Sequence, residues 1–185
     1  MKTNPFLEKT DFPKWSKLKP ESIKTDITKA LELAEFNLLA IRKTDLEKVT
    51  FANSVKALEQ STSDLNEAWG LVGHLDSVCN SKELRDAHNE MLPAVTEFFA
   101  KISLDADIWK VIKTFADTKE ASDLSPIDRR LLEETIQDFK ESGADLPEEK
   151  RARLEELSSE LAKITQKFSE NVLDATNAWE MVIYE

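Results

Sequence analysis

Glycine, proline and cysteine are scarce in this sequence: its 185 residues include three glycines, six prolines and one cysteine. Tight turns depend on glycine and proline, so their scarcity predicts few loops joining long elements, and therefore helices. Cys79 has no partner for an intrachain disulfide, and the cysteine content does not call for an oxidising compartment. In other respects the composition is globular, 41% hydrophobic and 33% charged.

Long apolar runs and a basic surplus are also missing. No run approaches the roughly 18 apolar residues that span a bilayer, and the N-terminus has no apolar core of signal-peptide length. Acidic residues outnumber basic ones 36 to 25, which gives a formal charge of −11. Lys and Arg are interspersed with Glu and Asp, so no basic face is expected to attract nucleic acid. These absences predict a cytoplasmic protein without membrane or nucleic-acid partners.

Apolar residues recur at spacings of three and four along most of the chain, which is typical of α-helices with a buried face. Pro20 opens the first helix, at a position where a missing N–H costs nothing. Leu33, Phe36 and Ala40 form a second apolar face on it and indicate burial on two sides. The next seam runs over residues 51–79 and predicts one helix of about eight turns.

Capping and helix-breaking residues predict the boundaries that follow. In chain order they are a cap at either Asn80 or Ser81, a kink or break at Pro93, a short helix over 108–115, a start at Ser125 and Pro126, and an end at Gly143.

One long charged helix with a narrow apolar seam occupies the C-terminal third. It begins at Pro147, whose following acids favour the positive end of a helix, and would extend about 48 Å to Ala178. Its seam is Leu154, Leu157, Leu161, Ile164, Phe168, Val172 and Ala175. Residues 179–185 resemble the first half of a strand, and this strand would need a partner outside the sequence. We therefore expect the chain to have been cut from something larger.

The sequence thus predicts an all-α bundle of about six helices, two or three of them long. An extended arm over residues 1–19 precedes the helical domain of residues 20–178, with Phe6, Phe12 and Trp15 holding the arm across the bundle. Residues 179–185 would lead as a strand or linker into an absent catalytic region. Separated from that region, exposed apolar helix faces should favour self-association.

Two histidines are the only candidates for a metal site. A helical zinc site needs two histidines four residues apart with a glutamate after the first, and neither His74 nor His88 has such a neighbour. They are 14 residues apart, about 21 Å along a continuous helix. We interpret His74 as a core or interface residue. A small metalloenzyme that uses both histidines stays open as a third hypothesis.

Other reactive side chains also have simpler explanations. Cys79 lies on an apolar stripe, where a free cysteine usually behaves as a small hydrophobe. The acid pairs at 148–149 and 155–156 alternate with basic residues and are typical of a solvated helix face. Trp69, Trp109 and Trp179 fall in apolar patterns and indicate core or interface positions. From the residues alone, no catalytic, metal or cofactor-binding residue is predicted.

Several strings in the chain resemble one family. They are LPEEK at 146–150, FSENVLDAT at 168–176, HLDSVCNSKELR at 74–85, NPFL at 4–7 and FPKW at 12–15. In their order along the chain they resemble the N-terminal region of the M3 family of zinc oligopeptidases, which includes the thimet oligopeptidase and oligopeptidase A groups. The resemblance spans nearly the whole chain.

The resemblance implies a cytoplasmic zinc metalloendopeptidase that cleaves short peptides in a deep channel between two mostly helical halves. The N-terminal helices would form part of one wall and help to exclude folded proteins. The zinc motif His-Glu-x-x-His of the family lies far downstream, so the resemblance implies zinc for the parent and an inactive chain here. The alternative is a free-standing helical module, without catalytic activity, that binds peptides or a protein.

Overall fold

The computed structural model describes residues 4–181, and the regular structure in that range is entirely helical. The elements in chain order are η1 (Pro5–Leu7), η2 (Trp15–Lys17), α1 (Pro20–Arg42), η3 (Leu46–Lys48), α2 (Val55–Ser61), α3 (Ser63–Val78), α4 (Lys82–Ser103), α5 (Ala106–Ala116), α6 (Lys119–Ser122), α7 (Pro126–Glu141) and α8 (Glu148–Asn177). The predicted all-α class is confirmed.

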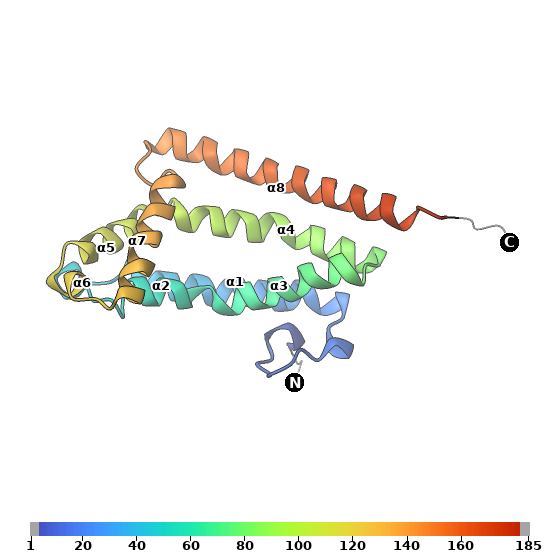
Figure 1. Ribbon diagram of the computed structural model, residues 1–185, viewed down its shortest axis with the longest axis horizontal. Helices are drawn as coiled ribbons and strands as arrows, with labels where there is room; N and C mark the ends of the chain where they lie inside the picture. The colour runs from blue at the N-terminus through green and yellow to red at the C-terminus, as the bar shows by residue number, and fades with distance from the viewer. Residues whose placement is uncertain (1–3, 182–185) are drawn as a thin grey trace.

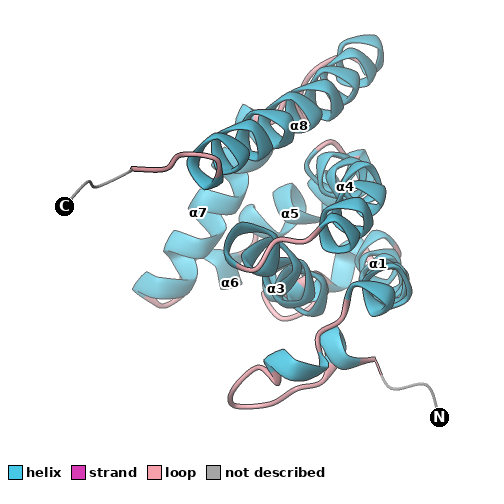
Figure 2. Ribbon diagram, turned by 90° about the vertical axis from the view of Figure 1, so that its right-hand side faces the viewer, coloured by secondary structure: helices cyan, strands magenta, loops and turns pink. Residues whose placement is uncertain are grey.

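The long helices run side by side. Figure 1 shows α8, α4 and the α1–α3 pair as successive layers, with α5, α6 and α7 gathered at one end. Seen along the layers, α8 lies beside α4 (Figure 2), and it also reaches the end of α3, where Gln166 donates to Asp76 at 3.3 Å. The bundle proper is therefore built from α1, α3 and α4, and α8 is an outer layer.

Two apolar clusters stabilise the bundle. Around the first half of α1, Ile23, Ile27 and Leu65 are fully buried with side chains of α3 and α4. Around its last turns, Leu38 and Phe115 are fully buried among α5, α6 and α7. Each large aliphatic or aromatic side chain that is removed from water contributes roughly 1.5–3 kcal/mol to the free energy of folding. Burial in these two clusters therefore stabilises the packing of the other helices along α1.

The N-terminal segment is tied to the bundle at one buried carboxylate. Asp26 of α1 accepts hydrogen bonds from the backbone N–H of Phe6 at 2.9 Å and from Asn4 Nδ2 at 2.8 Å. Phe6 is buried, whereas Phe12 is 84% exposed and holds nothing in place. The segment forms two 3₁₀ turns, and the division of the chain at residue 19 stays a prediction.

The predicted helix over residues 51–79 is wrong in one respect, because it divides into α2 and α3 at Thr62. Three consecutive hydroxyl residues, 61–63, lie at this point, and such side chains compete for backbone groups. Ser61 Oγ donates to the carbonyl of Leu58 at 2.7 Å. The linker after α5 also forms an unpredicted single turn, α6, which Thr118 caps.

Two further expectations concern Pro93 and the second apolar face of α1. The predicted break at Pro93 is wrong, because α4 continues from Lys82 to Ser103, and the alternative of a kink stays a prediction. The second apolar face of α1 is not buried, since Phe36 is 71% exposed and Leu33 and Ala40 are also exposed. Periodicity identifies an apolar face, but only a neighbouring element can bury it, and the described residues leave Phe36 on this side of α1 largely uncovered.

The predicted C-terminal helix is confirmed as α8. Residues 179–181 follow it without regular structure. The remaining residues of the expected strand, 182–185, lie outside the described residues, so the strand stays a prediction.

Candidate functional site

The two histidines occupy separate aromatic environments. His88 is buried in α4 and stacks on Trp69, with ring centroids 4.7 Å apart. His74 is exposed on α3 and lies against Trp15, with ring centroids 5.3 Å apart. Between residues 4 and 181, no three His, Cys, Asp or Glu side chains gather in a way that could hold a metal ion. The structure therefore gives the two-histidine metalloenzyme no support.

The other side chains considered from the sequence divide between core and surface. Trp109 is buried, and its Nε1 donates to Asp145 at 2.9 Å. Cys79 is exposed at the end of α3, so its expected burial is wrong. The last buried residue of α3 is Val72, so the buried part of its apolar stripe ends before Cys79. Trp179 is exposed after α8 and is no core residue.

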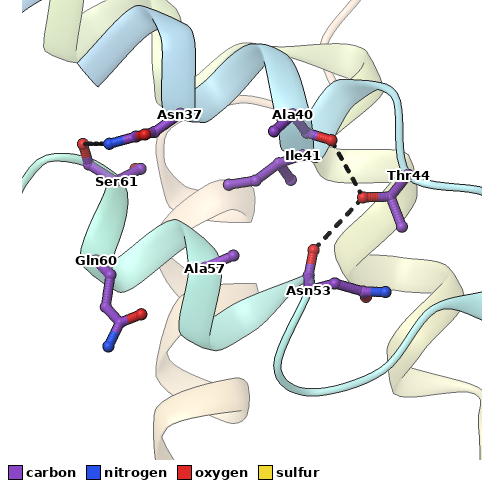
Figure 3. Close-up of a pocket in the computed structure, with 8 residues that line it drawn as sticks. All are labelled: Asn37, Ala40, Ile41, Thr44, Asn53, Ala57, Gln60 and Ser61. Carbon is purple, nitrogen blue, oxygen red and sulfur yellow. Dashed lines mark hydrogen bonds between the residues drawn. The ribbon is translucent and has the colours of Figure 1, made fainter. Parts of the chain in front are cut away.

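A pocket of about 400 Å³ lies between α1 and α2 (Figure 3). It is lined by Asn37, Ala40, Ile41, Thr44, Asn53, Ala57, Gln60 and Ser61. Asn37 Nδ2 donates to the carbonyl of Ser61 at 3.3 Å, and Thr44 Oγ1 donates to the carbonyl of Ala40 at 3.4 Å, so these two polar side chains of the pocket already bond to the backbone (Figure 3). None of the lining side chains ionises near neutral pH, and the pocket holds no group for acid–base or metal chemistry.

A groove of about 640 Å³ between α1 and α4 is charged, and most of its charged side chains are paired. Arg42 Nη1 donates to Glu35 at 2.6 Å, and its Nε donates to Asp105 at 2.6 Å. Burial acts to lower the pKa of Arg42, and these two carboxylates outweigh it and raise the pKa. Lys101 pairs with Glu97 on α4. The groove is thus a set of structural ion pairs along the bundle.

The contact between α4 and α8 is strongly polar. Asn89 Nδ2 donates to Glu170 Oε1 at 2.6 Å. Arg85 forms a two-pronged pair with Asp174, at 2.7 Å from Nη2 and 3.0 Å from Nη1. Arg151 at the other end of α8 donates to the carbonyl of Leu104 at 3.3 Å. A row of hydrogen bonds therefore runs along this contact.

These contacts perturb two carboxyl groups. The hydrogen bond from Asn89 lowers the pKa of Glu170 and outweighs its desolvation. The paired Arg85 guanidinium lowers the pKa of Asp174 in the same way. Both shifts favour the charged carboxylate in the folded protein, so the α4–α8 contact depends on ionisation.

The predicted seam of α8 exists, but most of it lies exposed. Phe168 is 68% exposed, Ile164 66% and Leu161 64%. We call the five large exposed side chains of this face the outer stripe; they are Leu157, Leu161, Ile164, Phe168 and Val172. The residues that bond to α4 and its C-cap (151, 170 and 174), and Gln166, which bonds to Asp76 of α3, lie on a different face of the helix.

A hollow of about 310 Å³ adjoins this stripe between α3 and α8. Phe168 and Val172 line it from the stripe, together with Asp76 and Ser77 of α3 and further residues of α8. Asp76 accepts hydrogen bonds from Asn80 at 2.7 Å and from Gln166 at 3.3 Å. Asp76 and Glu170, the two acids that line the hollow, already accept hydrogen bonds, so the remaining surface of the hollow is mainly apolar.

The family follows from comparison of the sequence with known proteins. Residues 22–151 match the family profile described as "Neurolysin/Thimet oligopeptidase, N-terminal domain". The chain belongs to this oligopeptidase family. The resemblance read from the short strings is thereby confirmed, and the chain is an N-terminal region of an M3 oligopeptidase.

Several curated relatives match almost the whole chain. Oligopeptidase A of Haemophilus influenzae is 32% identical over 181 residues, which is 98% of this chain and 26% of that protein. Oligopeptidase A of Escherichia coli is 30% identical over the same shares. A probable cytosolic oligopeptidase A of Arabidopsis thaliana is 30% identical over 99% of this chain and 26% of its own length. The chain thus spans about a quarter of the length of these relatives.

The family profile and the relatives differ in how far they extend. The profile ends at residue 151, within the first turn of α8, whereas similarity to the E. coli relative covers 181 residues. Most of α8 therefore belongs to the shared polypeptide but lies beyond the N-terminal domain profile. Among the described residues, no helix combines the length and apolar character needed to cross a membrane.

The sequence predicted exposed apolar helix faces but did not identify the seam of α8 as one of them. Residues on the inner side of α8 are mostly small or polar, as Ser158, Ala162 and Gln166 illustrate. An amphipathic helix of a free-standing bundle normally turns its apolar face to the core. A helix with a small polar face beside an apolar face can pack through either, and periodicity does not distinguish them.

Proposed function

We propose that this chain is the N-terminal helical domain of a zinc-dependent metalloendopeptidase that cleaves short peptides. The match of residues 22–151 to the N-terminal domain profile carries the proposal. Relatives named oligopeptidase, which share the entire matched region at about 30% identity, support it. The chemistry would be supplied by polypeptide beyond this region.

In this proposal the bundle forms part of the wall of the substrate channel. Its long parallel helices support such a role, because α1, α3 and α4 pack along most of their lengths and give a stiff surface. A stiff wall selects substrates by shape and excludes folded proteins. This region would thus contribute selection of short peptides and no proton transfer.

The residues of this chain do not fit a zinc ion. In the described part of the chain, no three suitable ligands lie together, and His88 is stacked in the core. We assign no catalytic, cofactor-binding or metal-binding residue here. In the full-length parent, zinc would activate a water for attack on the peptide carbonyl, and its ligands would come from outside this region.

A second candidate is a free-standing helical module that binds peptides or a protein partner. The outer stripe of α8 favours it, because contiguous exposed apolar side chains often mark interaction sites. The gene distinguishes the two candidates. A reading frame that continues past codon 185 into a His-Glu-x-x-His motif supports the first, and a native stop codon directly after Glu185 supports the second.

We also propose a cytoplasmic location. A relative described as probable cytosolic supports it, while another Arabidopsis relative is described as chloroplastic/mitochondrial. Cell fractionation with an antibody to this chain tests the proposal, and recovery in an organelle would contradict it.

A further inference from the structure

The orientation of α8 is the reverse of that of an ordinary surface helix. A helix on the outside of a globular protein buries its apolar face and leaves its polar face in water. On α8, hydrogen bonds and ion pairs hold the contact with α4, and the outer stripe remains exposed. Such an arrangement leaves apolar area in water that a suitable partner would remove.

The outer stripe has the dimensions of a helix-packing surface. From Leu157 to Val172 its members are separated by four, three, four and four residues, over about 22 Å at 1.5 Å per residue. This spacing presents ridges that an apolar helix can interdigitate with. The hollow between α3 and α8 lies at one end of the stripe and is bounded by Phe168 and Val172.

The extent of the sequence similarity indicates where the partner comes from. The N-terminal domain profile stops at residue 151, yet the E. coli relative remains similar over 181 residues and is about four times as long. The outer stripe therefore lies in the segment that connects the profiled domain to the rest of such a polypeptide. In such a relative, the polypeptide that follows this segment is tethered directly after α8 and can therefore reach the outer stripe.

The charges around the hollow favour an apolar partner. Asp76 and Glu170 both line it, but Asn80, Gln166 and Asn89 already donate to them. A cation entering the hollow would compete with existing hydrogen bonds, whereas a large aliphatic or aromatic side chain would meet free apolar surface. Buried anchors of this kind usually contribute most of the energy of an interface.

We propose that the outer stripe and the adjoining hollow are the docking surface for the part of the oligopeptidase polypeptide that follows this region in the full-length relatives. That part meets α8 with an apolar helical face and places one large apolar side chain in the hollow. The proposal rests on the proposed function, because it takes its partner from the same family of polypeptides.

Thiol labelling tests the docking directly. A hybrid protein carries this chain in place of the matching segment of E. coli oligopeptidase A, and Cys79→Ser removes the exposed native thiol. Leu161→Cys places a thiol on the outer stripe, and Lys163→Cys places a control thiol on another exposed face of α8. Each variant is labelled with a maleimide, in the hybrid and in the dilute chain alone.

We expect the thiol from Leu161→Cys to react about tenfold more slowly in the hybrid than in the dilute chain alone. A tenfold difference corresponds to about 1.4 kcal/mol of free energy. The control thiol should react at the same rate in both proteins. Equal rates for Leu161→Cys in both would overturn the proposal. If the thiol from Leu161→Cys already reacted more slowly than the control thiol in the dilute chain alone, a second copy of the chain would be covering the stripe. That result would also overturn the proposal.

Peptide hydrolysis by the hybrid separates this proposal from the proposed function. If the hybrid hydrolyses the peptide but the thiol at position 161 is not protected, the proposed function is supported and the docking surface is contradicted. Protection without hydrolysis by a zinc-loaded hybrid supports the docking surface and counts against the function. If the hybrid shows neither hydrolysis nor protection, both the proposed function and the docking surface are contradicted.

Discussion

Asn89 of α4 donates from Nδ2 to Glu170 of α8 at 2.6 Å, one turn away from the pair between Arg85 and Asp174 in the polar contact between the two helices. The carboxylate is buried, so its hydrogen bonds replace the water it has lost. The bond joins an outer helix to a bundle whose other contacts are largely apolar.

Removing this bond should loosen α8 selectively. We expect Asn89→Ala to reduce the stability of the α4–α8 contact by about 1.5–3 kcal/mol, because a hydrogen bond to a charged group is lost. Amide hydrogen exchange in α8 should accelerate while exchange in α1 stays unchanged. Asn171→Ala, at an exposed position of α8, is the matched control and should alter neither. Equal acceleration in both helices would contradict the idea of a separately held outer layer.

Acid should weaken the same contact. The pKa values of Glu170 and Asp174 are lowered in the folded protein from ordinary values of 4.5 and 3.8. Their stabilising contribution is therefore complete above those values and is lost as pH falls through the lower folded-state pKa values. We expect the thermal midpoint to fall on acidification below about pH 4.5. Glu170→Gln should show a smaller fall over this range, and an unchanged pH profile would refute the assignment.

Gly143 should resist substitution, because it ends α7 with φ of +91°. A Cβ at this position would lie 2.6 Å from Leu146 Cδ1, so Gly143→Ala combines backbone strain with overlap. We expect a loss of about 1–3 kcal/mol in urea unfolding. Gly70→Ala in α3 is the control: its Cβ meets nothing within 4 Å, and it should add about 0.5–1 kcal/mol. Equal effects would show that the turn is not strained.

The N-terminal segment should detach when its buried anchor is removed. Asp26→Ala leaves the buried N–H of Phe6 without an acceptor, which costs about 1–3 kcal/mol. Trypsin should then cleave faster at the lysines of residues 9–17. Asp11→Ala, an exposed change, should leave the cleavage rate as it is. A rate unaffected by Asp26→Ala would mean that the segment is held by other contacts.

In concentrated solution the chain alone should associate, because its outer stripe has no other partner to meet. Light scattering at millimolar protein should reveal a dimer or larger assembly. The double substitution Leu161→Ser and Phe168→Ser should restore the monomer, whereas Phe36→Ser on α1 should have less effect. A clean monomer of the unaltered chain at this concentration would contradict the prediction.

Local features of the fold could be predicted from the sequence. Ser125 and Pro126 fix the start of α7, and Gly143 follows its end, because caps and positive φ are properties of a few adjacent residues. Phe36 shows the limit. Its spacing identifies an apolar face on α1, but burial of that face depends on a neighbouring helix that the pattern cannot supply.

The candidate site shows the same division. The spacing of Leu161, Ile164 and Phe168 identifies one face of a helix, and the structure confirms the helix. Which face packs on α4 was decided by distant residues, since Arg85 and Asn89 select the polar side. Contacts over some 80 residues of chain leave no periodic signal within α8 itself.

Peptide hydrolysis by the hybrid with E. coli oligopeptidase A tests the central claim most directly. If this chain is the N-terminal domain of such an enzyme, the hybrid should cleave a short fluorogenic peptide, lose that activity to a chelator and regain it with zinc. It should leave a folded protein substrate intact. A folded, zinc-loaded hybrid that cleaves no peptide would contradict the account.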